Sequence, residues 1–236
     1  MTPPTNDAWV LRMSAVRARP WFLGADVSLA AGQSVAIAAS AAAATHFADL
    51  VQGFVTPVEG VVAVCGEEWR AMSVPRTYAL RARTGRIGPS MHWIQNLNVD
   101  ENVLLAQLDH SQRTEPELRA QALALAQQLG LDAVPRSRPH DTAPGDLLAS
   151  AVVRAFLGAP ALVVIEPLPA DASDALRTGL GEVGREASAR GTTVIWLGDP
   201  VWLGDAVGVG SAPGAGQHAL SLATVLELVA SPAGTA

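Results

Sequence analysis

Short apolar runs alternate with segments of helical spacing along most of this chain. Apolar strands are predicted at residues 33–37, 60–64, 162–166 and 192–197. Between them, Leu118, Ala122, Leu125 and Leu129 recur three or four positions apart, which predicts a helix over 118–131. Strands and helices that alternate in this way are typical of an α/β fold.

An alanine-rich loop, residues 38–46, joins the first of these strands to a helix predicted to start at Phe47. A strand, a small-residue loop and a helix form the unit that binds phosphate in proteins with the motif G-x-x-x-x-G-K-[ST]. Ala38 and Ala43 fall on the two motif glycines, and Ala44 falls on the lysine. The alternative interpretation is a plain helix N-terminus in an alanine-rich protein.

Two hydroxyl groups remain in this loop, those of Ser40 and Thr45. In a working loop the glycine amides surround the phosphates, the lysine reaches the outer oxygens and the hydroxyl holds magnesium. Only Thr45 keeps its motif identity. We therefore interpret Ser40, Ala44 and Thr45 as a vestigial phosphate-binding loop.

Six further segments resemble, in order and spacing, those of the ATPase subunits of ABC transporters. They lie at residues 60–66, 97–103, 129–131, 152–156, 160–167 and 192–199. The resemblance covers residues 20–210 and implies a P-loop NTPase-like ABC cassette. Such a cassette has a β-rich N-terminal layer, a RecA-like core and a helical subdomain.

The resemblance also implies how the chain is divided. We expect one cassette over residues 1–236, with an α/β core at 8–85 and 151–210 and a helical subdomain at 86–150. Residues 211–236 are expected to form a loop and a C-terminal helix or tail, and residues 1–7 a frayed end.

Each catalytic element of the family is altered in this register. The signature sequence falls on Ala143, Pro144 and Gly145, where proline removes a backbone donor and fixes φ. The Walker B strand is one residue short, so that either Ile165 replaces the magnesium-binding aspartate or that aspartate is deleted, and Glu166 remains as a vestigial catalytic base.

The switch histidine and the Q-loop glutamine are also missing. Gly198 stands where the switch histidine is expected, and the segment between Gly88 and Met91 is too short for the usual glutamine. Phosphoryl transfer depends on positioning and charge stabilisation by several groups together. The sequence therefore predicts a pseudo-ATPase that needs no cofactor, whereas active family members use ATP and magnesium.

The aromatic segment after the Q-loop position is the predicted partner surface. Met91, Trp93 and Ile94 suit a groove that receives a helix from a membrane subunit. The alternative is that these side chains pack internally. The expected partners are an ABC permease, a competent ABC ATPase, or a second copy in a dimer.

Composition narrows the other possibilities. A net charge of −6 and a pI near 5.3 argue against a nucleic-acid partner. Five histidines without paired spacing predict no metal site, and Cys65 is expected as a buried thiol in an apolar strand. The chain carries no predicted signal peptide or membrane span. We expect it in the cytoplasm, peripheral at the inner face of the membrane through its partners.

Two functional interpretations remain open. The first is a structural or regulatory subunit of an ABC transporter without catalysis. The second is a weakly active or ATP-binding subunit whose divergent site still works through Thr45 and Glu166. Residues 102–119 are similar to the ATPases of bacterial MCE-type phospholipid-trafficking systems, which implies lipid transport.

Overall fold

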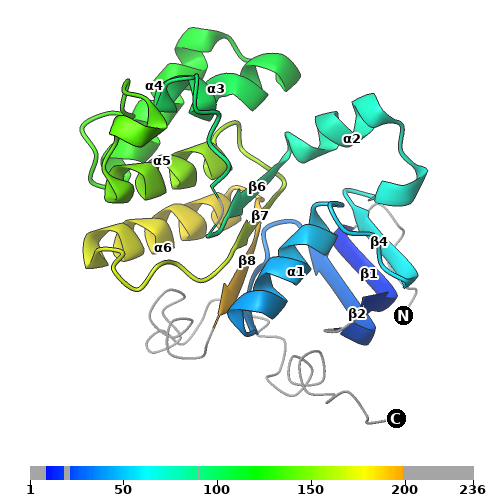
Figure 1. The fold of residues 1–236 in the computed structure, drawn as a ribbon. Coiled ribbons are helices and arrows are strands. Elements are labelled where there is room, and N and C mark those ends of the chain that lie inside the picture. The colour runs from blue at the N-terminus through cyan, green and yellow to red at the C-terminus, as the bar shows by residue number, and fades with distance from the viewer. Residues whose placement is uncertain (1–8, 19–21, 90, 199–236) are drawn as a thin grey trace.

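The computed structural model describes residues 9–18, 22–89 and 91–198 (Figure 1). The predicted tail at 1–7 and the predicted loop and helix at 211–236 lie outside these residues. In the part that is described, no helix is long and apolar enough to cross a membrane.

The first sheet is antiparallel and is built mainly from the N-terminal third of the chain. Its strands are β1 (Trp9–Ala18), β2 (Phe22–Ala30), β4 (Glu59–Val64) and β5 (Glu67–Glu68), in the order β2-β1-β4-β5. This sheet is the β-rich N-terminal layer that the sequence predicts.

Cys65 lies in the turn between β4 and β5 and not inside a strand, which corrects the expectation for this thiol. Its φ is 50°, the following Gly66 has φ 79°, and its side chain is only partly buried. Burial nevertheless raises the pKa of the Cys65 thiol above its ordinary value, although the positive charge of Arg83 acts to lower that pKa.

The second sheet is parallel and forms the centre of the molecule. Its strands are β3 (Ser34–Ala38), β8 (Thr193–Gly198), β7 (Leu162–Ile165) and β6 (Thr84–Ile87), in the order β3-β8-β7-β6. Every residue of β7 and β8 is buried, because both faces of this sheet are covered.

Two apolar clusters divide the side chains of these central strands. Val163 and Ile165 of β7 face a cluster with α3 (Val99–His110), α4 (Glu115–Gln128), α5 (Pro144–Phe156) and α6 (Asp174–Ala189). Leu162 and Val164 face the other cluster, with α1 (Ala41–Val51) and the antiparallel sheet. The alternation follows from the two-residue period of a strand.

The helices α3, α4 and α5 pack together as a lobe beside the parallel sheet (Figure 1). Leu118, Ala122 and Leu125 are buried, as the predicted helix requires. Across the central sheet, α2 (Val74–Arg81) and the short 3-10 helix η2 (Trp69–Ala71) lie near α1, and η3 (Pro139–Asp141) precedes α5. The sequence predicts subdomain boundaries after residues 85 and 150. The first falls inside β6 and the second inside α5, so each of these elements continues across a predicted boundary.

Candidate functional site

The alanine-rich loop is largely helical. The helix α1 begins at Ala41 and not at Phe47, which leaves Ala39 and Ser40 as the connection from β3. Alanine is the strongest helix former, so these residues extend the helix towards its N-terminus. Ser40 caps the helix, since its Oγ accepts a hydrogen bond from the Ala43 N–H at 3.4 Å.

Ala44 occupies the position of the lysine and points into the protein. Its side chain is 0% exposed and packs with Phe47 and Val51 in the cluster beneath the antiparallel sheet. The chain contains no lysine at all, because its 16 basic residues are all arginine. No ammonium group of this chain can therefore take the place of the motif lysine.

Thr45 and Glu166 meet at the centre of the candidate site. The Thr45 hydroxyl donates a hydrogen bond to Glu166 Oε2 at 2.5 Å, and the Glu166 side chain is 1% exposed. Glu166 directly follows β7, and its N–H donates to the Ile87 carbonyl at 2.8 Å. The carboxylate is thus turned towards the hydroxyl that the family resemblance assigns to magnesium.

Arg86 of β6 completes this cluster. Its Nε donates to Glu166 Oε1 at 2.7 Å, and its Nη1 donates to Asp49 Oδ1 of α1 at 2.6 Å. Its Nη2 also faces the Thr45 carbonyl at 3.5 Å. Burial works to lower the pKa of Arg86, but the hydrogen bonds to Glu166 and Asp49 keep that pKa above its ordinary value.

Sequence reasoning missed Arg86 and Asp49. One charged residue between Gly85 and Ile87 carries no motif, and only the pairing of β6 with β7 brings it beside Glu166. Gly88 gives a further constraint, because a Cβ at this position would lie 2.1 Å from Glu166 Oε1. A glycine immediately after an arginine-bearing strand was the one local signal of close packing there.

The other predicted site residues lie in two places. Gly198 ends β8, and its carbonyl accepts a hydrogen bond from the Ala39 N–H at 2.9 Å, which brings it beside the loop. Ala143, Pro144 and Gly145 lie exposed at the beginning of α5 in the helical lobe. Proline fits there because the first position of a helix needs no N–H donor.

The side chains of the segment predicted to bind a partner differ in their burial. Met91 and Trp93 are partly buried and pack against the helical cluster, whereas Ile94 is 42% exposed. The Arg154 guanidinium lies 4.4 Å from the centre of the Trp93 ring and donates to the Met91 carbonyl. Trp93 thus packs against other parts of this chain, as the alternative interpretation of the segment expects.

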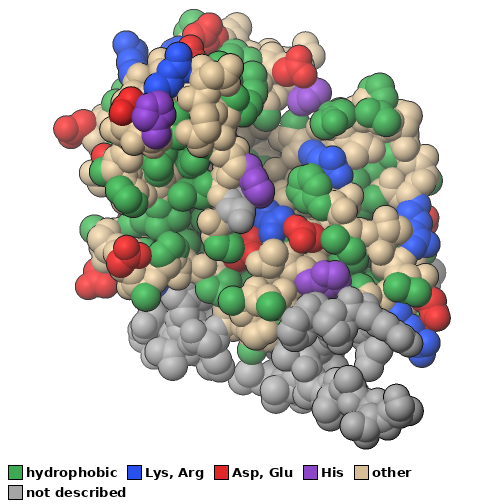
Figure 2. Space-filling view, in the orientation of Figure 1, with side chains coloured by type: hydrophobic (Ala, Val, Ile, Leu, Met, Phe, Trp, Pro, Cys, Tyr) green, Lys and Arg blue, Asp and Glu red, His purple; other side chains and the backbone are tan. Residues whose placement is uncertain are grey.

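A cleft of about 590 Å³ opens between α1 and α2 on one side and α3 and α5 on the other. Figure 2 shows the molecule hollowed between the helical lobe and the α2 side, with charged and histidine side chains at the centre of this face. The apolar lining includes Phe54, which is 58% exposed, and Met91.

Two arginines of this cleft have no carboxylate within ion-pair distance among the described residues. Arg81 donates to the carbonyls of Gln52 and Gly53 and stacks 4.2 Å from the centre of the Phe54 ring. Arg154 is partly buried, and desolvation of its guanidinium lowers its pKa to about 10. The cleft is thus positively charged in a chain whose net charge is negative.

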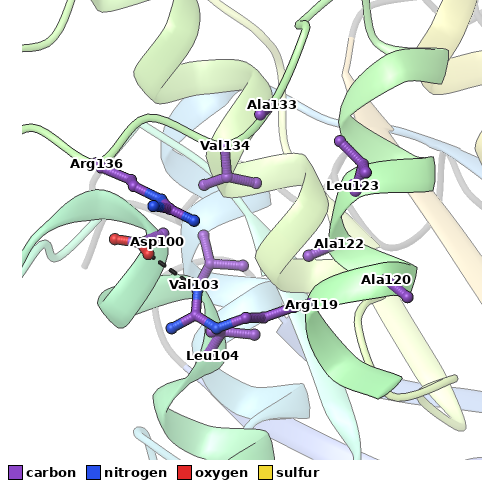
Figure 3. A pocket seen from close by; sticks show the side chains of 10 residues that line it. All are labelled: Asp100, Val103, Leu104, Arg119, Ala120, Ala122, Leu123, Ala133, Val134 and Arg136. Carbon is purple, nitrogen blue, oxygen red and sulfur yellow. Dashed lines mark hydrogen bonds and ion pairs between the residues drawn. The ribbon is translucent and has the colours of Figure 1, made fainter. Parts of the chain in front are cut away.

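A smaller pocket of about 290 Å³ lies within the helical lobe (Figure 3). Its lining is mostly apolar, and the Arg119 guanidinium points towards Asp100, 3.0 Å from its Oδ2. Arg119 is also paired with Glu115 at 2.8 Å. Its charge is therefore satisfied within the lobe, and we assign the candidate site to the P-loop region and the larger cleft.

Comparison with curated proteins finds relatives among ABC ATP-binding proteins, although no protein-family model matches the chain. The lipoprotein-releasing system ATP-binding protein LolD of Pseudomonas syringae is 28% identical over 176 residues, which are 74% of this chain and 77% of LolD. LolD of Xanthomonas campestris is 32% identical over 147 residues, 61% of each chain. The chain is thus similar over about three fifths of the length of the Xanthomonas protein.

Solved structures agree on the fold. An ATP-binding subunit of an ABC transporter superposes with a TM-score of 0.72 at 19% identity, over 83% of this chain and 81% of that one. The dimeric bacterial ABC transporter cassette MJ0796 superposes with a TM-score of 0.67 at 15% identity, over 81% and 88%. The chain therefore has the ABC ATPase cassette fold, as the sequence predicted.

Proposed function

We propose that this chain is a subunit of an ABC transporter that acts through its contacts and not through ATP hydrolysis. The observation that carries this proposal is the packing of the P-loop position. The helix α1 is capped by Ser40, and Ala44 lies in the core where a lysine would have to face phosphate.

The remaining polar groups of the site are occupied by one another. Thr45 donates to Glu166, and the other oxygen of Glu166 accepts from Arg86. Catalysis of phosphoryl transfer requires donors and a metal that stabilise charge on the transferred group. In this arrangement the residues do not fit a magnesium nucleotide, so we assign them no step of hydrolysis.

We further propose that the cleft between α1, α2, α3 and α5 receives a segment of a membrane partner. Phe54 of the cleft offers exposed apolar area, and Arg81 and Arg154 offer positive charge with no carboxylate of the described residues within ion-pair distance. An amphipathic helix with one apolar face and a carboxylate satisfies both features. Such a partner places the chain at the cytoplasmic side of a membrane.

The cargo that we propose is a molecule that carries lipid. The names of the similar LolD proteins concern lipoprotein release, and the resemblance of residues 102–119 concerns phospholipid trafficking. Both classes of cargo have acyl chains in common. The phospholipid subfamily itself is a proposal that rests on the sequence resemblance alone.

Co-purification with the membrane subunit encoded nearest to this chain tests the partner surface. Phe54→Ala removes an exposed side chain of the cleft, so the fold is retained, and it is expected to weaken association about 10-fold or more if Phe54 is an interface anchor. Leu123→Ala is the matched control, since Leu123 is 42% exposed on α4 outside the cleft. Equal binding by these two variants would overturn the assignment of the cleft.

One observation supports the alternative of a weakly active subunit. The 2.5 Å contact of Thr45 with Glu166 keeps together the hydroxyl that the family resemblance assigns to magnesium and the carboxylate that it assigns to the catalytic base. Thr45→Ala distinguishes the two functions. The contact-based function predicts unchanged association and transport, whereas lost transport with intact assembly would return the function to the nucleotide site.

A further inference from the structure

The cluster around Arg86 joins three elements that are distant in the sequence. Arg86 comes from β6, Glu166 follows β7, and Asp49 and Thr45 belong to α1. The contacts between Arg86 and Glu166 span 80 positions of sequence, and those between Thr45 and Glu166 span 121. One guanidinium therefore ties the P-loop helix to two strand ends of the parallel sheet.

The charges in this cluster require a cation. Glu166 is almost fully buried and Asp49 partly so, and two carboxylates this close to one positive group are stable only while that group is present. The oxygens of two carboxylates and a hydroxyl are also the ligands that hard divalent cations prefer. In this chain the guanidinium of Arg86 stands among these oxygens.

We propose that Arg86 is the resident cation of the degenerate site, taking the electrostatic place that magnesium and the P-loop lysine hold in active cassettes. This inference rests on the proposed function, in which the site does not bind a magnesium nucleotide. It explains how the junction of α1, β6 and β7 is held together without nucleotide. Arginine suits this place because its planar fork bonds several oxygens at once and it stays charged at every physiological pH.

The shape of the backbone supports this assignment. A Cβ at Gly88 would come within 2.1 Å of Glu166 Oε1, the oxygen that accepts the hydrogen bond from Arg86 Nε. The absence of a Cβ at Gly88 therefore leaves the space in which the carboxylate lies against Arg86. The geometry holds Glu166 facing inward, between the guanidinium and the Thr45 hydroxyl.

Thermal unfolding of the purified chain tests the proposal, with Mn²⁺ as the probe cation. Arg86→Gln removes the charge and keeps a polar side chain, and it is expected to lower Tm by about 10 °C because it leaves buried carboxylates unpaired. Millimolar Mn²⁺ is expected to restore several degrees of that loss and to leave the wild-type Tm unchanged. The rescue should disappear in Arg86→Gln combined with Glu166→Gln.

Two further variants keep the test decisive. Arg190→Ala is the control, since Arg190 forms an exposed pair with Glu186 at 3.4 Å and its loss should shift Tm by about 1 °C or less. If Arg86→Gln does not fold, Arg86→Lys should still fold with a lowered Tm, because it keeps the charge but forms fewer hydrogen bonds.

Three results would overturn the role of Arg86. They are a Tm of Arg86→Gln within about 1 °C of wild type, a Mn²⁺ response of the wild type equal to that of the variant, and a rescue that does not need Glu166. Failure of the proposed function looks different, because it consists of ATP binding or of ATP-dependent transport by the wild-type chain.

Discussion

Ala44 lies in the first turn of α1 with its methyl group against the core, where its side chain is 0% exposed. A side chain that points towards Phe47 and Val51 cannot also point towards a phosphate. Restoring the motif residue therefore places an ammonium group among apolar side chains. Burial of a charge without a partner costs several kcal/mol.

We expect Ala44→Lys to lose stability and to gain no ATP hydrolysis. The free energy of unfolding should fall by roughly 3 kcal/mol or more, which denaturant titration measures. In the register of the family resemblance, the signature, switch histidine and Q-loop glutamine would still be absent, and groups that act as a unit do not restore activity one at a time. Ala42→Lys is the control, because Ala42 is exposed on the same helix and should tolerate lysine.

Turnover by Ala44→Lys above that of Ala42→Lys, with unchanged stability, would contradict this packing. It would mean that the lysine reaches the pocket and that the remaining groups suffice for hydrolysis.

At the scale of elements, the contact between β6 and α5 fixes where the helical lobe meets the sheet. Gly85 of β6 lies against the backbone of α5, and a Cβ there would come within 2.1 Å of the Ala155 carbonyl oxygen. The same strand carries Arg86, so that any displacement of β6 also moves the guanidinium away from Glu166. The lobe and the candidate site are thus connected through one short strand.

Gly85→Ala is expected to lower the free energy of unfolding by about 1–3 kcal/mol, because the backbone atoms that it meets cannot move aside as a side chain can. Gly145→Ala is the matched control. Gly145 lies in the exposed first turn of α5 with nothing within 4 Å of the added Cβ, so alanine should be neutral or stabilise by up to about 1 kcal/mol. Equal stability of both variants, measured by urea titration, would show that α5 is not packed tightly on β6.

At the scale of the whole molecule, the fold follows from patterns that are local in sequence. The apolar runs of β7 and β8, the helical spacing from Leu118 and the order of the family segments all lie within short windows, so they predict the α/β cassette correctly. The start of α1 was predicted too late, since glycine positions of the family were transferred to residues that favour helix. Helix propensity overrides a motif register when the glycines are gone.

The candidate site was predictable only in part for the same physical reason. Thr45 and Glu166 were identified from motif positions, but their contact is a consequence of tertiary structure. Arg86 and Asp49 belong to no motif, and they reach Glu166 only because β6 pairs with β7 and α1 packs alongside. A cluster of charges assembled across the fold leaves no local pattern that a sequence can show.

Titration of the purified wild-type chain with Mg-ATP by calorimetry is the measurement that tests the central claim most directly. The claim is that the P-loop position, with Ser40 capping α1, Ala44 in the core and Arg86 beside Glu166, no longer accommodates a magnesium nucleotide. We predict no saturable heat up to millimolar ATP, with or without magnesium. A single-site isotherm with a Kd in the micromolar range would contradict the account.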